Sequence, residues 1–256
     1  MTANSQQSSP EQQEMPLIQH LLELRSRLLK VVLAAAVCFA AIYPFANELY
    51  LLVSEPLRQL LPGGQTMIAT DITSPFFAPL KLALVLAVFV AIPYILFQIW
   101  SFIAPGLYSH EKRLAFPLLF TSVALFYAGA VFAYLVVFPL VFGFFTAIGP
   151  EGIVELPDID SYLTFVLKMF FAFGVAFEIP IATVLLILSG ATTPQALSAK
   201  RPYVVVACFV IGMMLTPPDI ISQTLLAVPM WVLFEFGIIF GRLASRETGA
   251  APGGNA

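Results

Sequence analysis

Two carboxylates that stand among basic residues are the best candidates for chemistry in this sequence. Arg25 and Arg27 follow Glu23, and two further basic residues come directly after Glu111. A carboxylate in such surroundings can bind a guanidinium group through short, paired hydrogen bonds. The residues leave a plainer interpretation open for each acid. Glu23 and Arg27 are four residues apart and could pair with each other on a helix, and Glu111 could be a solvated loop charge.

A third acid, Glu178, lies near the middle of an apolar stretch long enough to cross a bilayer. An ionisable group at that depth is costly, so it suggests a function by default. Two interpretations stay open: a proton site in an ion-coupled transporter of small solutes, or a structural hydrogen bond to a neighbouring helix. Lys81 and Lys168 lie nearer the ends of apolar segments, where a long side chain can extend to the membrane surface.

No other set of residues suggests catalysis or metal binding. The sequence offers no Ser, His and Asp combination in a recognisable context and no glycine-rich phosphate loop. Its two histidines lack clustered carboxylates or thiols, and Cys38 and Cys208 both fall in apolar segments, where cysteine is a small buried hydrophobe. We therefore expect a protein that is not an enzyme and that binds no cofactor and no metal.

The composition indicates an integral membrane protein built from helices. Of the 256 residues, 59% are hydrophobic and only 11% are charged, far from a soluble domain, where about 25% are charged. A crossing helix needs about 20 apolar residues, and the apolar runs lack the alternation of a membrane barrel. The sequence predicts an all-α polytopic protein with six helices, over residues 28–45, 77–102, 114–148, 162–189, 202–215 and 221–241.

Basic residues set the expected orientation. All of the 12 lysines and arginines except Arg58, Lys81 and Lys168 fall in the loops or at the helix ends on one side of the membrane. By the positive-inside rule, that side is cytoplasmic. Both termini are then cytoplasmic. We expect residues 1–16 to be a disordered tail, 17–242 to be the six-helix domain and 243–256 to be a flexible tail.

Three segments depart from a simple membrane helix. The fifth helix, 202–215, is too short for a core about 30 Å thick, and we expect helices 5 and 6 to be the short ones. The third helix, 114–148, is long enough that it must tilt, bend near Pro139 or project beyond the lipid. The loop 46–76 is rich in proline and glycine and should form short helices and turns.

Several motifs in order along the chain resemble the TatC family, the multi-spanning receptors of the twin-arginine protein translocase. The resemblance covers residues 17–242. Its motifs are HLLELRSRL at 20–28, SPFF at 74–77, FIAPGLY at 102–108 with HEKR at 110–113, FEIP at 177–180, RPY at 201–203, and LTPPD at 215–219 with SQT at 222–224.

The resemblance implies a receptor in the bacterial inner membrane for signal peptides that carry consecutive arginines. It also implies single-spanning TatA-like and TatB-like partners, further copies of the chain itself, and export driven by the proton-motive force, with no role for nucleic acid. The positions that match functional residues of the family are Glu23, Arg25, Arg27, Phe102 and Glu111 for the signal peptide, Glu178 and Gln223 for partner helices, and Pro56 and Asp219 on the outer side.

Overall fold

The described part of the chain is almost wholly α-helical. The computed structural model describes residues 10–60, 68–103, 115–148, 158–215 and 220–247, and contains no β-strand within them. This confirms the all-α fold class. The elements are α1 (Pro10–Ile42), the 3-10 turn η1 (Tyr43–Phe45), α2 (Ala46–Leu60), α3 (Ser74–Ile103), α4 (Ala115–Phe132), the π-helix η5 (Ala133–Val137), α5 (Phe138–Ile148), α6 (Ile159–Ala176), α7 (Ile179–Leu188), α8 (Pro194–Ala199), α9 (Arg201–Leu215) and α10 (Ile220–Glu247).

Five helical stretches of the described residues are long and apolar enough to cross a membrane, and a sixth apolar helix is shorter. The five stretches cover 21–55, 74–102, 116–144, 159–188 and 223–244, which confirms a polytopic membrane protein. The shorter helix is α9, whose 15 residues reach only about 23 Å. The sixth helix was also expected to be short, but it corresponds to α10, which has 28 residues.

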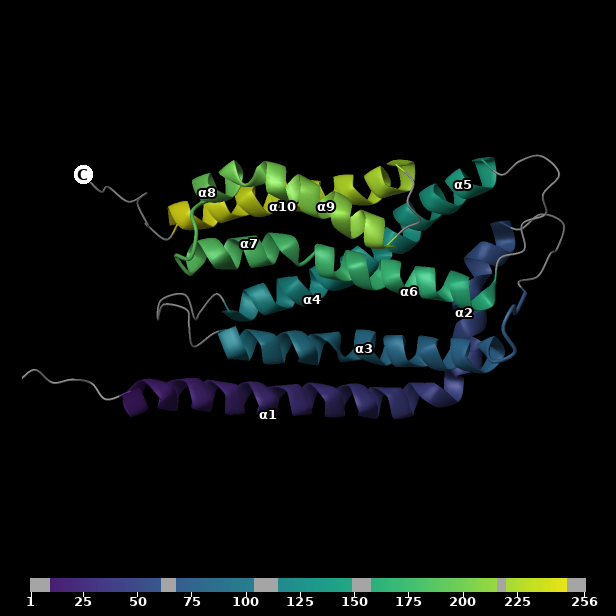
Figure 1. Ribbon diagram of the computed structural model, residues 1–256, viewed down its shortest axis with the longest axis horizontal. Helices are drawn as coiled ribbons and strands as arrows, with labels where there is room; N and C mark the ends of the chain where they lie inside the picture. The colour runs from purple at the N-terminus through teal and green to yellow at the C-terminus, as the bar shows by residue number, and fades with distance from the viewer. Residues whose placement is uncertain (1–9, 61–67, 104–114, 149–157, 216–219, 248–256) are drawn as a thin grey trace, which may run out of the picture.

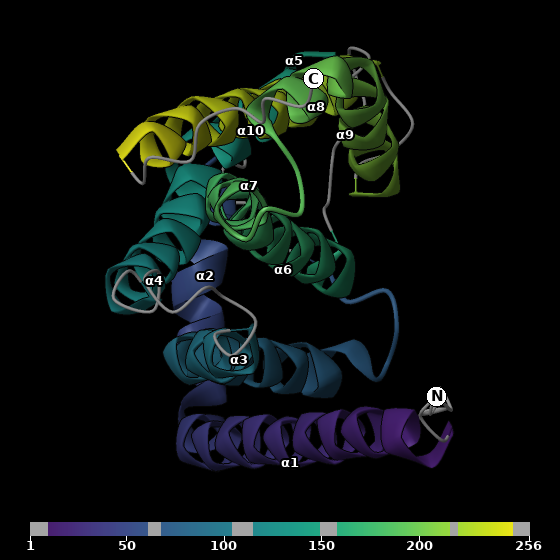
Figure 2. The same ribbon diagram turned by 90° about the vertical axis from the view of Figure 1, so that its left-hand side faces the viewer.

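Figure 1 shows the long helices lying side by side along one direction, with α2 crossing them at one end. The first residues of α1 and the last residues of α10 lie at the same end, which we call the terminal end. The α2 end is the opposite one, where α3 and α6 begin. Seen from the terminal end, α1 and α3 form one side, α4, α6 and α7 cross the middle, and α8, α9 and α10 form the other side (Figure 2).

Prolines account for two interruptions that divide expected helices. The expected helix 114–148 contains the π-helix η5, which ends just before Pro139, and this is where a bend was predicted. Proline has no amide hydrogen to donate and its ring crowds the preceding turn, so the regular hydrogen-bond pattern fails there. The expected helix 162–189 stops at Ala176 and resumes as α7 at Ile179, with Pro180 in the first turn. Glu178 therefore sits at a break between two helices rather than within one.

Small residues let the central helices approach closely. A Cβ on Gly129 of α4 would lie 2.4 Å from the carbonyl oxygen of Phe173 on α6, and a Cβ on Gly237 of α10 would lie 2.8 Å from Cβ of Thr183 on α7. Membrane helices have no hydrophobic driving force between them, so such close van der Waals contact is a main source of their association. Phe173 is fully buried at the centre of this packing.

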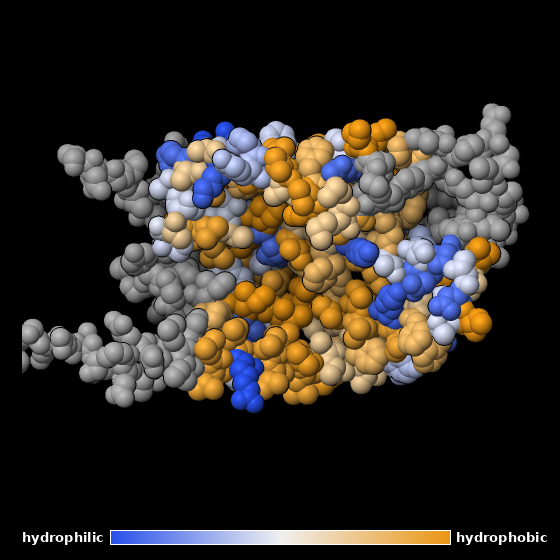
Figure 3. All heavy atoms as spheres, in the orientation of Figure 1, coloured by the Kyte–Doolittle hydropathy of each residue, from blue (hydrophilic) through white to orange (hydrophobic). Residues whose placement is uncertain are grey.

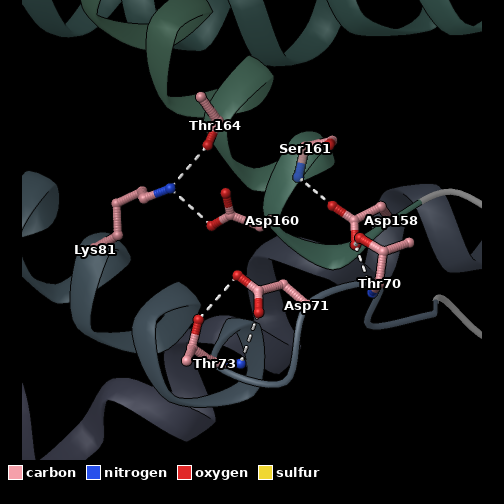
Figure 4. A network of polar contacts seen from close by, with 8 residues as sticks. All are labelled: Thr70, Asp71, Thr73, Lys81, Asp158, Asp160, Ser161 and Thr164. Atoms are coloured by element: carbon pink, nitrogen blue, oxygen red, sulfur yellow. Dashed lines mark hydrogen bonds and ion pairs between the residues drawn. The ribbon is translucent and has the colours of Figure 1, made fainter.

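A polar network fixes the α2 end (Figure 4). Asp158 caps α6 by accepting from the Ser161 amide at 2.9 Å, and it accepts from the amide and the hydroxyl of Thr70 at 3.1 and 2.8 Å. These hydrogen bonds hold the pKa of Asp158 well below its usual range, with the Ser161 amide contributing most. Lys81 of α3 was expected to extend to the membrane surface, but its ammonium lies 2.7 Å from Asp160 of α6. The network joins α3 and the segment before it to α6.

The helices extend into both expected tails. α1 begins at Pro10, within the range 1–16, and α10 continues to Glu247, within the range 243–256. Residues 1–9 and 248–256 lie outside the described residues. Of the loop 46–76, the part 46–60 forms the helix α2, as expected.

Candidate functional site

The predicted acid Glu23 is held at the terminal end by an arginine of its own helix. Arg27 donates from Nη2 and Nε to the same carboxylate oxygen, Oε1, at 2.6 and 2.9 Å. The pairing between residues four apart, which the sequence left open, is therefore present. The Glu23 side chain is 41% exposed and that of Arg27 is 22% exposed, so the carboxylate faces outward from a partly buried guanidinium.

The guanidinium of Arg27 also binds the last turn of α3. Its Nη1 donates to Oε1 of Gln98 at 3.2 Å, and its Nη2 donates to the carbonyl oxygen of Ser101 at 3.1 Å. Gln98 is 6% exposed, which is unusual burial for an amide in an apolar helix. Its amide oxygen is one of the two groups of α3 that bind Arg27. A cation at the carboxyl end of a helix is favoured by the helix dipole. Arg27 thus fixes Glu23 against α3.

The second carboxylate oxygen of Glu23 remains accessible. Both contacts from Arg27 reach Oε1 of Glu23. No hydrogen bond joins Oε2 to any of the described residues. A carboxylate can accept about four hydrogen bonds. The site therefore presents an anchored, half-exposed anionic oxygen at the rim of the bundle.

The other residues expected to bind a signal peptide fall in three different situations. Phe102 is half-buried in the last turn of α3 and follows Ser101, whose carbonyl oxygen Arg27 binds. Arg25 is exposed on α1, on a face other than that of Glu23 and Arg27. Glu111 lies outside the described residues, in the segment between α3 and α4.

Glu178 forms a second polar site inside the bundle. Its Oε2 accepts a hydrogen bond from the hydroxyl of Ser122 on α4, a partner that the sequence did not suggest. Its Oε1 is buried and has no hydrogen-bond partner within the described part of the chain. A buried polar atom of this kind usually requires a partner, which can be supplied by another molecule.

Gln223, expected to dock partner helices, is bonded within the chain. Its Nε2 donates to the carbonyl oxygen of Phe209 at 2.8 Å and so ties α10 to α9. A Cβ on Gly212 would lie 3.3 Å from Cγ of Gln223, so a small residue makes room for this contact. Of the two residues expected on the outer side, Pro56 lies in α2, at the opposite end from Glu23, and Asp219 lies outside the described residues.

The fold and the site define a class of protein: a multi-pass helical membrane protein with an anchored carboxylate at one rim and a buried carboxyl group in its centre. Within the described ranges there is no group of three or more histidine, cysteine, aspartate and glutamate side chains that could hold a metal ion.

Comparison with known proteins places the chain within this class. A family model described as Sec-independent protein translocase protein (TatC) matches residues 19–229. The chain is 60% identical over 243 residues to the TatC protein of Azotobacter chroococcum, covering 94% of this chain and 95% of that protein. It is 56% identical over 227 residues to TatC of Escherichia coli, covering 89% and 88%.

A solved structure agrees with the sequence comparisons. The crystal structure of a twin arginine translocase receptor, TatC, superimposes with a TM-score of 0.80 at 39% identity, covering 88% of this chain and 99% of that one. The chain belongs to the TatC family. It is a component of the Sec-independent protein translocase, with a role in protein transport. This assignment favours the translocase over the ion-coupled transporter of small solutes.

Proposed function

We propose that this chain is the receptor that binds signal peptides with consecutive arginines. The observation that carries the proposal is the Glu23 carboxylate, anchored through one oxygen by Arg27 and open at the other. An incoming guanidinium gains a charge-assisted hydrogen bond to Oε2 without breaking the contacts of Arg27.

The position of the anchored acid also supports recognition of a pair of arginines. Arg27 binds the carbonyl of Ser101, two residues before α3 ends at Ile103. The segment that carries Glu111 therefore starts from the helix end that Glu23 faces. Glu111 is the eighth residue after Ile103, and eight steps along an extended chain reach at most about 29 Å. Glu23 binds one arginine and Glu111 the other, with the apolar part of the signal peptide beside Phe102.

The terminal end is then the cytoplasmic side of a bacterial inner membrane. Lysines and arginines gather at this end, as the positive-inside rule requires. TatA-type and TatB-type single-spanning proteins and further copies of this chain complete the translocase, and the proton-motive force drives transport. The unpartnered oxygen of Glu178 is a docking point for a polar group on a partner helix.

An export assay tests the proposal in cells that lack their own TatC. The chain is supplied as the unaltered protein, as Glu23→Ala or as Glu111→Ala, together with a folded reporter that carries a twin-arginine signal. We expect export to be lost in both variants while each still accumulates in the membrane at the normal level. Glu48→Ala, which removes an exposed acid at the α2 end, serves as the matched control. Normal export by both Glu23→Ala and Glu111→Ala would contradict the proposal.

A further inference from the structure

A surface groove with an apolar lining is not used by the site at the terminal end. Its volume is about 690 Å³, and it lies between α3, α6, α9 and α10. The lining is apolar except at one end, where Lys81, Thr164 and Lys168 meet. Figure 3 shows apolar residues across the middle of one face of the molecule, with hydrophilic residues gathered toward both ends.

The positive charge at this end of the groove comes from Lys168. Lys81 is balanced by Asp160, at 2.7 Å, and donates to the hydroxyl of Thr164 at 3.0 Å. Lys168 follows Thr164 by one helical turn and is exposed, and no hydrogen bond or ion pair joins its ammonium to any described residue. No carboxylate belongs to the lining residues. The groove therefore combines an apolar trough with an unbalanced cation at one end.

The short helix α9 sets the depth of this cation relative to the membrane. Leu215, the last residue of α9, lines the same groove as Lys168, although Lys168 is nine residues inside α6. A helix that reaches about 23 Å cannot span a core of about 30 Å, so the polar boundary of the bilayer moves inward beside it. Lys168 thus lies at the depth of lipid headgroups even though it is about 13 Å along α6 from the first residue, Ile159.

We propose that the groove binds one anionic phospholipid, with its phosphate group at Lys168 and an acyl chain along α6. From Lys168 to Ala176 the groove follows α6 for about 12 Å, most of the roughly 15 Å that one leaflet contributes to the core. The volume falls within the range of about 300–1,000 Å³ that is typical of small-molecule sites.

Native mass spectrometry of the purified chain tests the proposal. The protein in detergent is titrated with dioleoyl phosphatidylglycerol and, separately, with dioleoyl phosphatidylethanolamine. Because one lysine near a membrane surface favours an anionic lipid by about fivefold in affinity, Lys168→Gln should weaken phosphatidylglycerol binding by roughly that factor and leave phosphatidylethanolamine unchanged. Lys168→Arg should retain the preference. Lys200→Gln, the same change at an exposed lysine of the terminal end, should have no effect.

A groove-filling variant provides a second test. Val175 is exposed and lines the groove, so Val175→Trp should weaken the binding of both lipids. The proposal is overturned if Lys168→Gln leaves phosphatidylglycerol affinity unchanged, or if Lys168→Gln and Lys200→Gln weaken it equally. It is also overturned if Lys168→Gln weakens only the binding of a single-spanning peptide that carries a carboxylate, which would assign the groove to a partner helix.

Discussion

Replacing Glu23 by glutamine removes the charge of the anchored carboxylate and keeps its shape. The amide oxygen can still accept from Arg27, so the link between α1 and α3 should persist. The outward side loses its anionic oxygen. A hydrogen bond to a charged group contributes about 1.5–3 kcal/mol when shielded, and an exposed ion pair about 0.2–1 kcal/mol. With the Glu23 side chain 41% exposed, we expect a loss of about 1–1.5 kcal/mol, or roughly five- to twelvefold in affinity.

Fluorescence anisotropy of a labelled signal peptide, with the protein in lipid nanodiscs, measures this effect. Peptides with an arginine pair and with a lysine pair are compared, because lysine cannot form a bidentate contact with a carboxylate. The unaltered protein should prefer the arginine pair, and Glu23→Gln should reduce that preference. Glu48→Gln, which neutralises an exposed acid at the α2 end, is the matched control. If Glu23→Gln binds both peptides as the unaltered protein does, the assigned role of the carboxylate is wrong.

Three further predictions concern the packing and the polar links. Gly129→Ala should lower the free energy of unfolding by about 1–3 kcal/mol, because its Cβ would overlap a backbone carbonyl of α6. Gly143→Ala should be nearly neutral, because nothing lies within 4 Å of its new Cβ. Thermal unfolding in detergent compares the two variants. The lowered pKa of Asp158 predicts that its stabilising contribution is complete well above the unfolded-state value of about 4, begins to fall below that pH and is lost fully only below the folded-state pKa. Thermal unfolding between about pH 3 and 7 should therefore show the start of an acid loss that Asp158→Asn removes. Gln223→Leu should cost roughly 0.5–1.5 kcal/mol by removing the link between α10 and α9, and an unchanged melting temperature would show that the hydrogen bond to Phe209 contributes nothing.

Local features of the sequence predicted much of the fold. Apolar runs of spanning length gave the helices, the spacing of Glu23 and Arg27 allowed their ion pair, and Pro139 marked the interrupted helix. Each of these signals is contained within a few turns of one helix. Periodicity and propensity act over the same distance, so a single sequence can reveal them.

The contacts that complete each site join distant parts of the chain. Arg27 reaches Gln98, which is 71 residues away, and Glu178 reaches Ser122, which is 56 residues away. Lys81 finds Asp160 across 79 residues, although the sequence alone favoured the membrane surface for its amine. Such pairs depend on how the helices pack, and no spacing rule within one helix encodes them. The local signal for the site at Glu23 was the spacing of Glu23 and Arg27, and it gave no hint of Gln98, whose burial only the structure shows.

Disulfide crosslinking tests most directly whether one signal peptide contacts both acids. In a chain with Cys38 and Cys208 replaced by alanine, a single cysteine is placed at Ser26, exposed and three residues after Glu23, or at Ser109, two residues before Glu111. The peptide carries one cysteine beside its arginine pair. The account predicts crosslinks to both positions, and their loss when the arginines are replaced by lysines. Crosslinks to only one position, or to neither, would contradict it.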